Sequence, residues 1–352
     1  MHWRDSRIVR RVTDTPADEV LDSALPVLTR AFGLGEVVGR RFLADGLMNR
    51  NWRLDTTGAS YAVKQIIDVP LARVHRNLKV LPGLAGEGLP VQAALASADG
   101  QYVVEIGERG YCVLPWVEGS HVQGVGLTLD QARGLGALLG RLHQSLARHV
   151  PTTPMPVSAP VAKVADPARA SEAAESLLAK LPPGPVDVFG RAAISALRER
   201  KALLDRYANR RPATGPPVGP LGWTHGDFQY RNLLRADGDV VAILDWDRVA
   251  VRPYAEEVAR TAQVQFGVGG VFDLERVAAF VSGYRSVVPL STEELADGVD
   301  RLWWKRMTDF WQLDFHFARQ DPVFGEMFLE GEALLHWWTD RLDQVQEAFA
   351  AG

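Results

Sequence analysis

The sequence predicts an α+β fold with two lobes, a small lobe built on an antiparallel sheet and a larger, mainly helical lobe. Short strand-like runs with glycine-bearing turns are concentrated in the first 117 residues. Apolar residues at helical spacing dominate the remainder. A chain of 352 residues is long enough for one such bilobal unit. We therefore expect lobes of residues 1–117 and 118–352, with a hinge near residues 114–118.

The small lobe is expected to begin with a helix from about Thr15 to Phe32, which stops near Gly33. Residues 71–84 also carry apolar side chains at helical spacing, but they include Pro82, which predicts a short or broken helix. The strand-like runs are expected at residues 36–42, 51–56, 60–67, 102–106 and 111–117.

The large lobe is expected to consist of helices and one short hairpin. Two strands, residues 232–235 and 240–244, flank a turn that contains Asp237 and Gly238. Helices are predicted at residues 129–147, 166–181 and 191–208, and from about Pro253 to the end.

Composition narrows the classes of protein. The hydrophobic fraction of 47% and the charged fraction of 23% are those of an ordinary globular protein. A net charge of −4 argues against a nucleic-acid partner, which would need a basic surface, although a local phosphate pocket is compatible with it. Cys112 is the single cysteine, so an intrachain disulfide is excluded. No apolar stretch suits a signal core or a membrane span, and a cytoplasmic location is expected, with the oligomeric state open.

Residues 223–247 carry the clearest chemical signal. Asp227 and Asn232 are five positions apart, and Asp245 follows one hairpin later at the end of an apolar strand. Phosphoryl transfer needs a carboxylate that orients and deprotonates a hydroxyl, and ligands that hold Mg²⁺ on a triphosphate. Protein kinases meet these needs with His-Arg-Asp-x4-Asn and a later aspartate. The spacing predicts Asp227 as the catalytic base and Asn232 and Asp245 as catalytic Mg²⁺ ligands.

Two neighbouring residues have less specific roles. His225 is expected to organise the loop through hydrogen bonds rather than to transfer protons. Asp247 either assists as a metal ligand or stabilises the loop. Any one of the motif residues alone is compatible with a simple turn, but together and in this order they favour catalysis.

This segment resembles the aminoglycoside phosphotransferase/choline kinase superfamily, in the runs His225-Gly226-Asp227-x4-Asn232 and Leu244-Asp245-Trp246-Asp247. The resemblance implies a protein-kinase-like fold and a kinase that uses Mg²⁺ and ATP or GTP to phosphorylate a small-molecule hydroxyl. It extends over roughly residues 45–260, through further matches at residues 45–54, 61–64, 88–91, 114–119 and 136–143.

The resemblance also implies where the nucleotide binds. Lys64 would contact the α/β-phosphates as a compact cation. Gly46 and the backbone near Asn49 would lie over the phosphates, in a turn that a plain hairpin would also need. The backbone of the hinge would bind adenine or guanine through Pro115, Trp116 and Val117.

One position departs from the family pattern. In this fold the lysine normally pairs with a glutamate on the small-lobe helix, but residues 71–86 contain none. Asn77 or Arg76 falls near the expected position. Either Glu87 reaches Lys64, the lysine is held differently, or the helix carries changes linked to the substrate.

Substrate contacts are expected from the catalytic loop, through Asp227 and Arg231, and from a tryptophan-rich stretch near residues 303–317. Lys305, Arg306 and Arg319 are mixed with the aspartates in and just after that stretch, so it does not clearly indicate a heavily cationic substrate. The candidates within and just beyond it are Asp309, Trp311, Asp314 and Asp321.

The leading interpretation is an antibiotic or related natural product, as for a resistance-type phosphotransferase. The alternative is a metabolic kinase of homoserine, choline or a sugar, and the run Asn49-Arg50-Asn51-Trp52 resembles the homoserine-kinase branch. A non-catalytic nucleotide-binding scaffold is the alternative from another class. A scaffold has no need for Lys64 and the catalytic-loop residues together.

Overall fold

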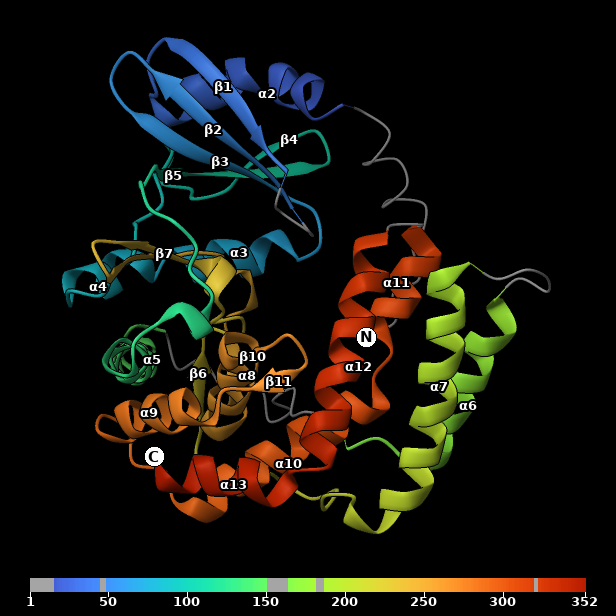
Figure 1. Ribbon diagram of the computed structural model, residues 1–352. Coiled ribbons are helices and arrows are strands. Elements are labelled where there is room, and N and C mark those ends of the chain that lie inside the picture. The colour runs from blue at the N-terminus through green and yellow to red at the C-terminus, as the bar shows by residue number, and fades with distance from the viewer. Residues whose placement is uncertain (1–15, 45–48, 151–163, 182–186, 320–321) are drawn as a thin grey trace. The chain divides into compact units, whose positions relative to one another are not determined.

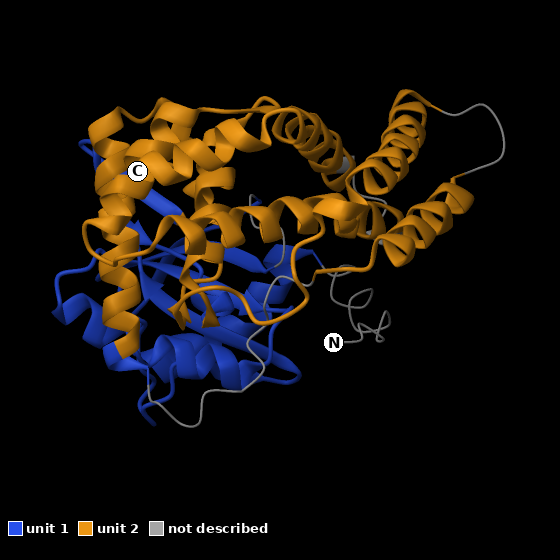
Figure 2. Cartoon of the chain, turned by 90° about the horizontal axis from the view of Figure 1, so that it is seen from below, with its two compact units in different colours: residues 1–120, 148–151, 233–249 blue, residues 121–147, 152–232, 250–352 orange. Residues whose placement is uncertain are grey.

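The computed structural model describes residues 16–44, 49–150, 164–181, 187–319 and 322–352. The chain divides into two compact units (Figure 2). Unit 1 comprises Met1–Ser120, Arg148–Pro151 and Leu233–Val249, and unit 2 comprises His121–Ala147, Thr152–Asn232 and Ala250–Gly352. The chain passes from unit 2 to unit 1 directly after Asn232, within the segment that carries the chemical signal.

Unit 1 is built on a five-stranded antiparallel sheet with the order β1-β2-β3-β5-β4 (Figure 1). The five strand-like runs of the sequence all form strands, which confirms the predicted sheet. They are β1 (Val37–Leu43), β2 (Arg50–Thr56), β3 (Ser60–Ile66), β4 (Val104–Ile106) and β5 (Arg109–Pro115).

Helix α2 (Ala17–Phe32) covers this sheet because its apolar residues recur every three or four positions. Gly33 ends the helix at φ 63°, a left-handed conformation that glycine adopts without strain. The shared core of helix and sheet includes Val20, Leu21, Ala24, Leu28, Trp52, Leu54, Val63 and Val113.

The predicted broken helix is confirmed as α3 (Leu71–Leu78) and α4 (Leu81–Gly86). Pro82 lies in the first turn of α4, where its missing N–H leaves no hydrogen bond unmade. Unit 1 also contains the predicted hairpin, β7 (Leu233–Ala236) and β8 (Asp239–Ile243). Asp237 and Gly238 at its tip both have positive φ, as a two-residue type I′ turn requires.

Unit 2 is mainly helical. Its helices are α5 (Leu129–His149, which ends in unit 1), α6 (Pro167–Lys180), α7 (Val188–Tyr207), α8 (Tyr254–Phe266), α9 (Leu274–Arg285), α10 (Thr292–Thr308), α11 (Trp311–Arg319), α12 (Pro322–Thr339) and α13 (Leu342–Ala351). Helices α5 and α9 approach closely, because a Cβ added to Gly136 would lie 1.8 Å from the Phe280 carbonyl oxygen. Among the described residues, no helix is both long and apolar enough to cross a bilayer.

Two short antiparallel pairs complete unit 2. Strand β6 (Leu221–Thr224) pairs with β9 (Ala250–Pro253), and β10 (Gly267–Val268) pairs with β11 (Val271–Phe272). The first pair places the catalytic loop directly after β6 and helix α8 directly after β9.

Candidate active site

Asp227 lies in the loop after β6, and three side chains of unit 2 hold its carboxylate. Oδ2 accepts hydrogen bonds from Gln229 Nε2 and Asn232 Nδ2, each at 2.9 Å. Oδ1 pairs with Arg260 Nη2 on α8 at 2.6 Å. The Asp227 side chain is 19% exposed, so it is oriented by its neighbours and still reachable by a substrate.

The backbone of this loop is fixed by Glu257 on α8. The N–H of His225, at 3.0 Å, and that of Gly226 both donate to the Glu257 carboxylate, which is buried. His143 Nε2 lies 2.6 Å from the same carboxylate, and Tyr284 contacts Nδ1 of that ring at 2.8 Å. Burial alone would raise the pKa of Glu257, but the hydrogen bond and charge of His143, with the charges of His225 and Arg252, lower the pKa to about 2.

His225 contributes to the same loop from within. Its Nδ1 accepts a hydrogen bond from the N–H of Asp227 at 3.3 Å, and its ring lies edge-on to Phe228. These contacts agree with the loop-organising role predicted for it.

Lys64 on β3 connects two carboxylates of unit 1. Its Nζ lies 2.7 Å from Asp245 Oδ1 and 2.7 Å from Asp247 Oδ2. Lys64 is 14% exposed and Asp247 is 5% exposed. Burial alone would lower the pKa of Lys64, but the two carboxylates raise it, so the ammonium is charged at neutral pH.

Asp247 and Asp245 follow β8 and differ in their surroundings. Asp247 is buried and accepts a hydrogen bond from Asn49 Nδ2 at 2.9 Å, while Asn49 Oδ1 accepts one from the Ile67 N–H. Burial raises the pKa of Asp247. Asp245 has φ 60°, an uncommon conformation for a residue other than glycine, and such positions concentrate at functional sites.

The missing glutamate has a structural answer, because the lysine is held differently. Asn77 on α3 instead donates to the Trp246 carbonyl at 2.7 Å, and Arg76 donates to the Val249 carbonyl at 3.0 Å. Helix α3 thereby holds the backbone of the segment that bears Asp245 and Asp247. Glu87 is occupied elsewhere, by Arg148 at 2.5 Å and by His149 at 2.8 Å.

The residues predicted to contact the base lie at the end of β5 and just beyond it. Pro115 is the last residue of β5, and the Trp116 N–H donates to the Ser60 carbonyl at 3.0 Å. The guanidinium of Arg53 lies 4.8 Å from the centre of the Trp116 ring. Val117 is partly buried, and Gly46 lies outside the described residues. Their nucleotide contacts stay predictions.

The predicted substrate residues of unit 2 have partners within the protein. Arg231 stacks over Tyr230, with 5.6 Å between guanidinium carbon and ring centre. Asp314 is 60% exposed and lies 3.6 Å from Lys180. Asp321 lies outside the described residues. Asp309 pairs with Lys305 and accepts a hydrogen bond from the Trp311 N–H. The Trp311 ring packs against Phe315 and Phe324. Their substrate contacts also stay predictions.

No local pattern in the sequence indicated Glu257 or Arg260. Both lie on α8, three positions apart and so on one face, and that face meets the catalytic loop. The one usable signal was a helix that starts directly after the short strand β9.

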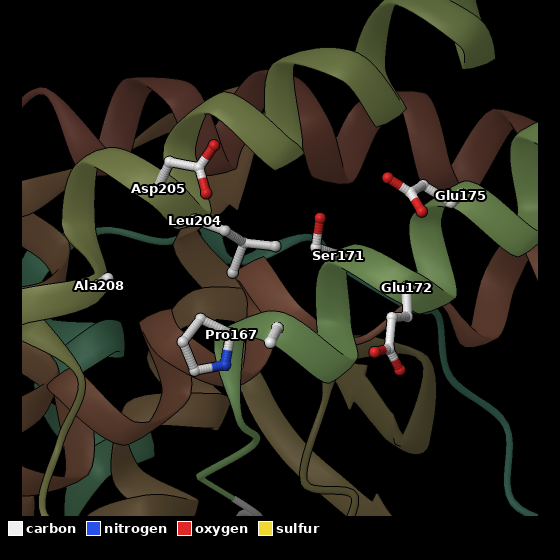
Figure 3. Close-up of a pocket in the computed structure, with 8 residues that line it drawn as sticks. Pro167, Ser171, Glu172, Glu175, Leu204, Asp205 and Ala208 are labelled. Carbon is white, nitrogen blue, oxygen red and sulfur yellow. The ribbon is translucent and has the colours of Figure 1, made fainter.

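A cavity of about 510 Å³ lies between α6 and α7. Figure 3 shows the carboxylates of Glu172, Glu175 and Asp205 around Ser171. None of the predicted site residues lines this cavity. Glu175 is also paired with Lys201, so the geometry gives the cavity no catalytic role.

The donor set of unit 1 fits a divalent cation. No group of three or more His, Cys, Asp or Glu side chains in the described part of the chain is arranged as a complete metal cage. Kinases need none, because Mg²⁺ takes one or two carboxylates and completes its shell with phosphates and water. Asp245 and Asp247 both face Lys64, and the charge of Asp245 raises the pKa of both Asp247 and Asp68, so a second cation is favourable here.

The sheet with its buried lysine, the Asp-x4-Asn loop and the aspartate after the hairpin together define a protein-kinase-like phosphotransferase. The chain belongs to the phosphotransferase enzyme family (APH), which matches residues 39–290. It is a kinase of small molecules that transfers phosphoryl from ATP to an alcohol.

Individual relatives support this assignment. A homoserine kinase of Neisseria meningitidis serogroup B is 27% identical, over 88% of this chain and 92% of that protein. The structure of spectinomycin phosphotransferase with ADP and spectinomycin has a TM-score of 0.64 at 15% identity, over 94% of this chain and 98% of that one. The structure of amicoumacin kinase with AMP-PNP, Ca²⁺ and its ligand has a TM-score of 0.62 at 17% identity, over 90% and 95%. At these identities the two structures show a shared fold.

Proposed function

We propose that this kinase phosphorylates the hydroxyl of homoserine or of a closely similar hydroxy amino acid, with Mg·ATP as the donor. A curated relative named homoserine kinase aligns over most of both chains and is more similar in sequence than the antibiotic kinases of similar fold. The proposal therefore favours the metabolic alternative over the antibiotic interpretation. The observation that carries the kinase chemistry is the Asp227 carboxylate, fixed by three donors yet accessible.

Asp227 accepts the proton of the substrate hydroxyl while the hydroxyl oxygen attacks the γ-phosphorus. The bond between that phosphorus and the β–γ bridging oxygen breaks, and ADP leaves with its electron pair. Asn232 and Gln229 hold Asp227 Oδ2, which orients the base.

In unit 1, Lys64 would contact the phosphates, and Asp245 and Asp247 would hold the divalent cation. Asn232, the last residue of unit 2 before β7, is the further ligand that the sequence motif predicts. When bound, the cation neutralises the charge that develops on the phosphoryl oxygens. The carboxylates hold Lys64 in place before nucleotide arrives.

The test is a nucleotide-consumption assay over homoserine, choline, pentoses, spectinomycin and a macrolide, with wild type, Asp227→Asn and Asp205→Asn. Asp205 is an exposed aspartate of α7 in the same unit and serves as the matched control. We expect turnover with homoserine, a loss of about 10²–10⁴-fold in Asp227→Asn with a nearly unchanged KM for ATP, and no loss in the control. Full activity in Asp227→Asn would remove the proposed base.

Turnover of spectinomycin or a macrolide instead of homoserine would support the antibiotic alternative. The antibiotic kinase is the second candidate function, and the similarity of fold to spectinomycin phosphotransferase is the observation that supports it. Mg·ATP binding without turnover of any compound would favour the scaffold.

A further inference from the structure

Arg260, the cation that touches the proposed base, has unused hydrogen-bonding capacity. Its Nη2 pairs with Asp227, while its Nη1 is screened from solvent and has no hydrogen-bond partner among the described residues. A buried guanidinium nitrogen without an acceptor is unfavourable. Although Nη1 itself is covered, the side chain as a whole is 38% exposed, so a ligand can reach other parts of it.

A second arginine, Arg306, lies on α10, which packs against α8. Arg306 donates to Gln263, which is buried on α8 three positions after Arg260. In the described ranges no carboxylate forms an ion pair with Arg306. Burial, together with the charges of Arg260 and Arg200, lowers the pKa of Arg306 to about 10. The guanidinium is still charged at neutral pH, and this part of unit 2 holds positive charge that the protein does not fully match.

The third arginine of this group, Arg200 on α7, already has acceptors within the protein for its hydrogen bonds. It forms a buried pair with Glu332 and donates to the carbonyls of Met307 and Asp309. Arg200 therefore has a structural role, and it adds to the positive potential without offering free donors. The cations available to a ligand are Arg260 and Arg306.

We propose that Arg260 and Arg306 bind a carboxylate of the acceptor substrate and thereby hold its hydroxyl at Asp227. This inference rests on the proposed function and narrows it to hydroxy acids and hydroxy amino acids. Guanidinium groups carry five N–H donors and bind carboxylates through pairs of them. Within the described residues only one hydrogen bond of Arg260, from Nη2 to Asp227, uses these donors, so others on its exposed part are left for a carboxylate. A polycationic acceptor would meet repulsion at the same place.

The test compares L-homoserine with L-homoserinamide, which keeps the hydroxyl and the ammonium group but replaces the carboxylate by a neutral amide. We expect wild type to prefer homoserine by about 10–100-fold in kcat/KM, the range of one or two charge-assisted hydrogen bonds. Arg306→Gln should reduce this preference to a few-fold, mainly through a higher KM for homoserine, with the KM for ATP unchanged. Arg306→Lys should restore part of the preference.

Arg198→Gln, a change at an exposed arginine of α7, is the matched control and should keep the wild-type preference. Thermal melting of each variant separates misfolding from lost recognition. Equal use of both compounds by wild type, or a rise in the KM for ATP alone in Arg260→Lys, would overturn the subsite while the kinase stands. Absence of turnover with every hydroxyl compound would instead overturn the proposed function.

Discussion

Lys64 neutralises two carboxylates, one of which is almost fully buried. Replacing it with methionine leaves Asp247 charged and unpaired, and removing one partner of a buried pair costs about 3–5 kcal/mol. We expect Lys64→Met to lose about 3 kcal/mol in the free energy of unfolding at pH 8 and to bind ATP weakly. Urea denaturation followed by tryptophan fluorescence measures the loss, with Lys79→Met, at the exposed residue that follows α3, as control.

This loss should depend on pH in a defined direction. Burial already raises the pKa of Asp247 above its ordinary value of 3.8, and removal of Lys64 raises it further. A carboxyl group with a raised folded-state pKa destabilises the protein as pH rises through the interval between the unfolded and folded values. The deficit of Lys64→Met should therefore be smaller at pH 5 than at pH 8. Equal deficits would contradict a charged Asp247 as the cause.

Among single residues, those in short motifs were predictable and their distant supports were not. Asp227 and Asn232 are five positions apart, and one hydrogen bond joins their side chains. Arg260 is 33 positions from Asp227, and no spacing rule connects an arginine of one helix to a loop before it. The sequence showed that the small-lobe helix lacks the expected glutamate partner of Lys64. Only the fold shows that Asp247 takes the place of that glutamate.

Helix α8 supports the catalytic loop through Glu257. The pKa of Glu257 is about 2, against an ordinary value of 4.5, and this difference corresponds to about 3 kcal/mol in the free energy of unfolding. Because the folded pKa is depressed, this stability is present above pH 4.5 and is lost as the pH falls toward 2. We expect Glu257→Gln to be less stable by about that amount at pH 7, with the difference from wild type shrinking below pH 4.5.

Glu257→Gln should also lower kcat, because an amide presents an N–H group to the loop donors that now bind a carboxylate. Denaturation curves from pH 7 to pH 3 and steady-state kinetics check both effects. Glu275→Gln, at an exposed glutamate of α9, is the control. A constant stability difference over this range would show that Glu257 is not held ionised by its neighbours.

Helix α3 supports the segment that carries Asp245 and Asp247, the proposed metal ligands, through Asn77, which is buried. Asn77→Ala removes the hydrogen bond to the Trp246 carbonyl and should cost about 1–3 kcal/mol. Amide hydrogen exchange should accelerate at residues 246–249, and the Kd for Mg·ATP should rise. Unchanged exchange there would mean that α3 does not hold this segment.

Local signals predicted most elements but not every pairing. The Asp237-Gly238 turn specified the β7–β8 hairpin, and Pro82 specified the break between α3 and α4. The β6–β9 pair was missed because each strand has four residues and its partner lies far along the chain. That pair determines where the catalytic loop and α8 begin, so the loop's support was missed with it.

The whole chain places its proposed chemistry in two compact units. Asp227 and the two arginines belong to unit 2, whereas Lys64 and the two aspartates proposed to bind the metal belong to unit 1. The bilobal class followed from the order of strands and helices, since that order is local information. The proposed carboxylate subsite did not follow from the sequence, because Arg260 and Arg306 come from different helices whose contact is a property of the folded unit.

Binding of Mg·ATP should therefore stabilise the whole protein. A ligand at 100 times its Kd adds about 2.7 kcal/mol to the native state, which should raise the melting temperature by a few degrees. The shift should disappear with EDTA and in Asp245→Asn, because a neutral amide at this position weakens the hold on the cation. Asp239→Asn, at the exposed start of β8, should shift like wild type. An equal shift in EDTA would show that nucleotide binds without the cation, and an Mg²⁺-dependent shift retained in Asp245→Asn would assign the metal to other ligands.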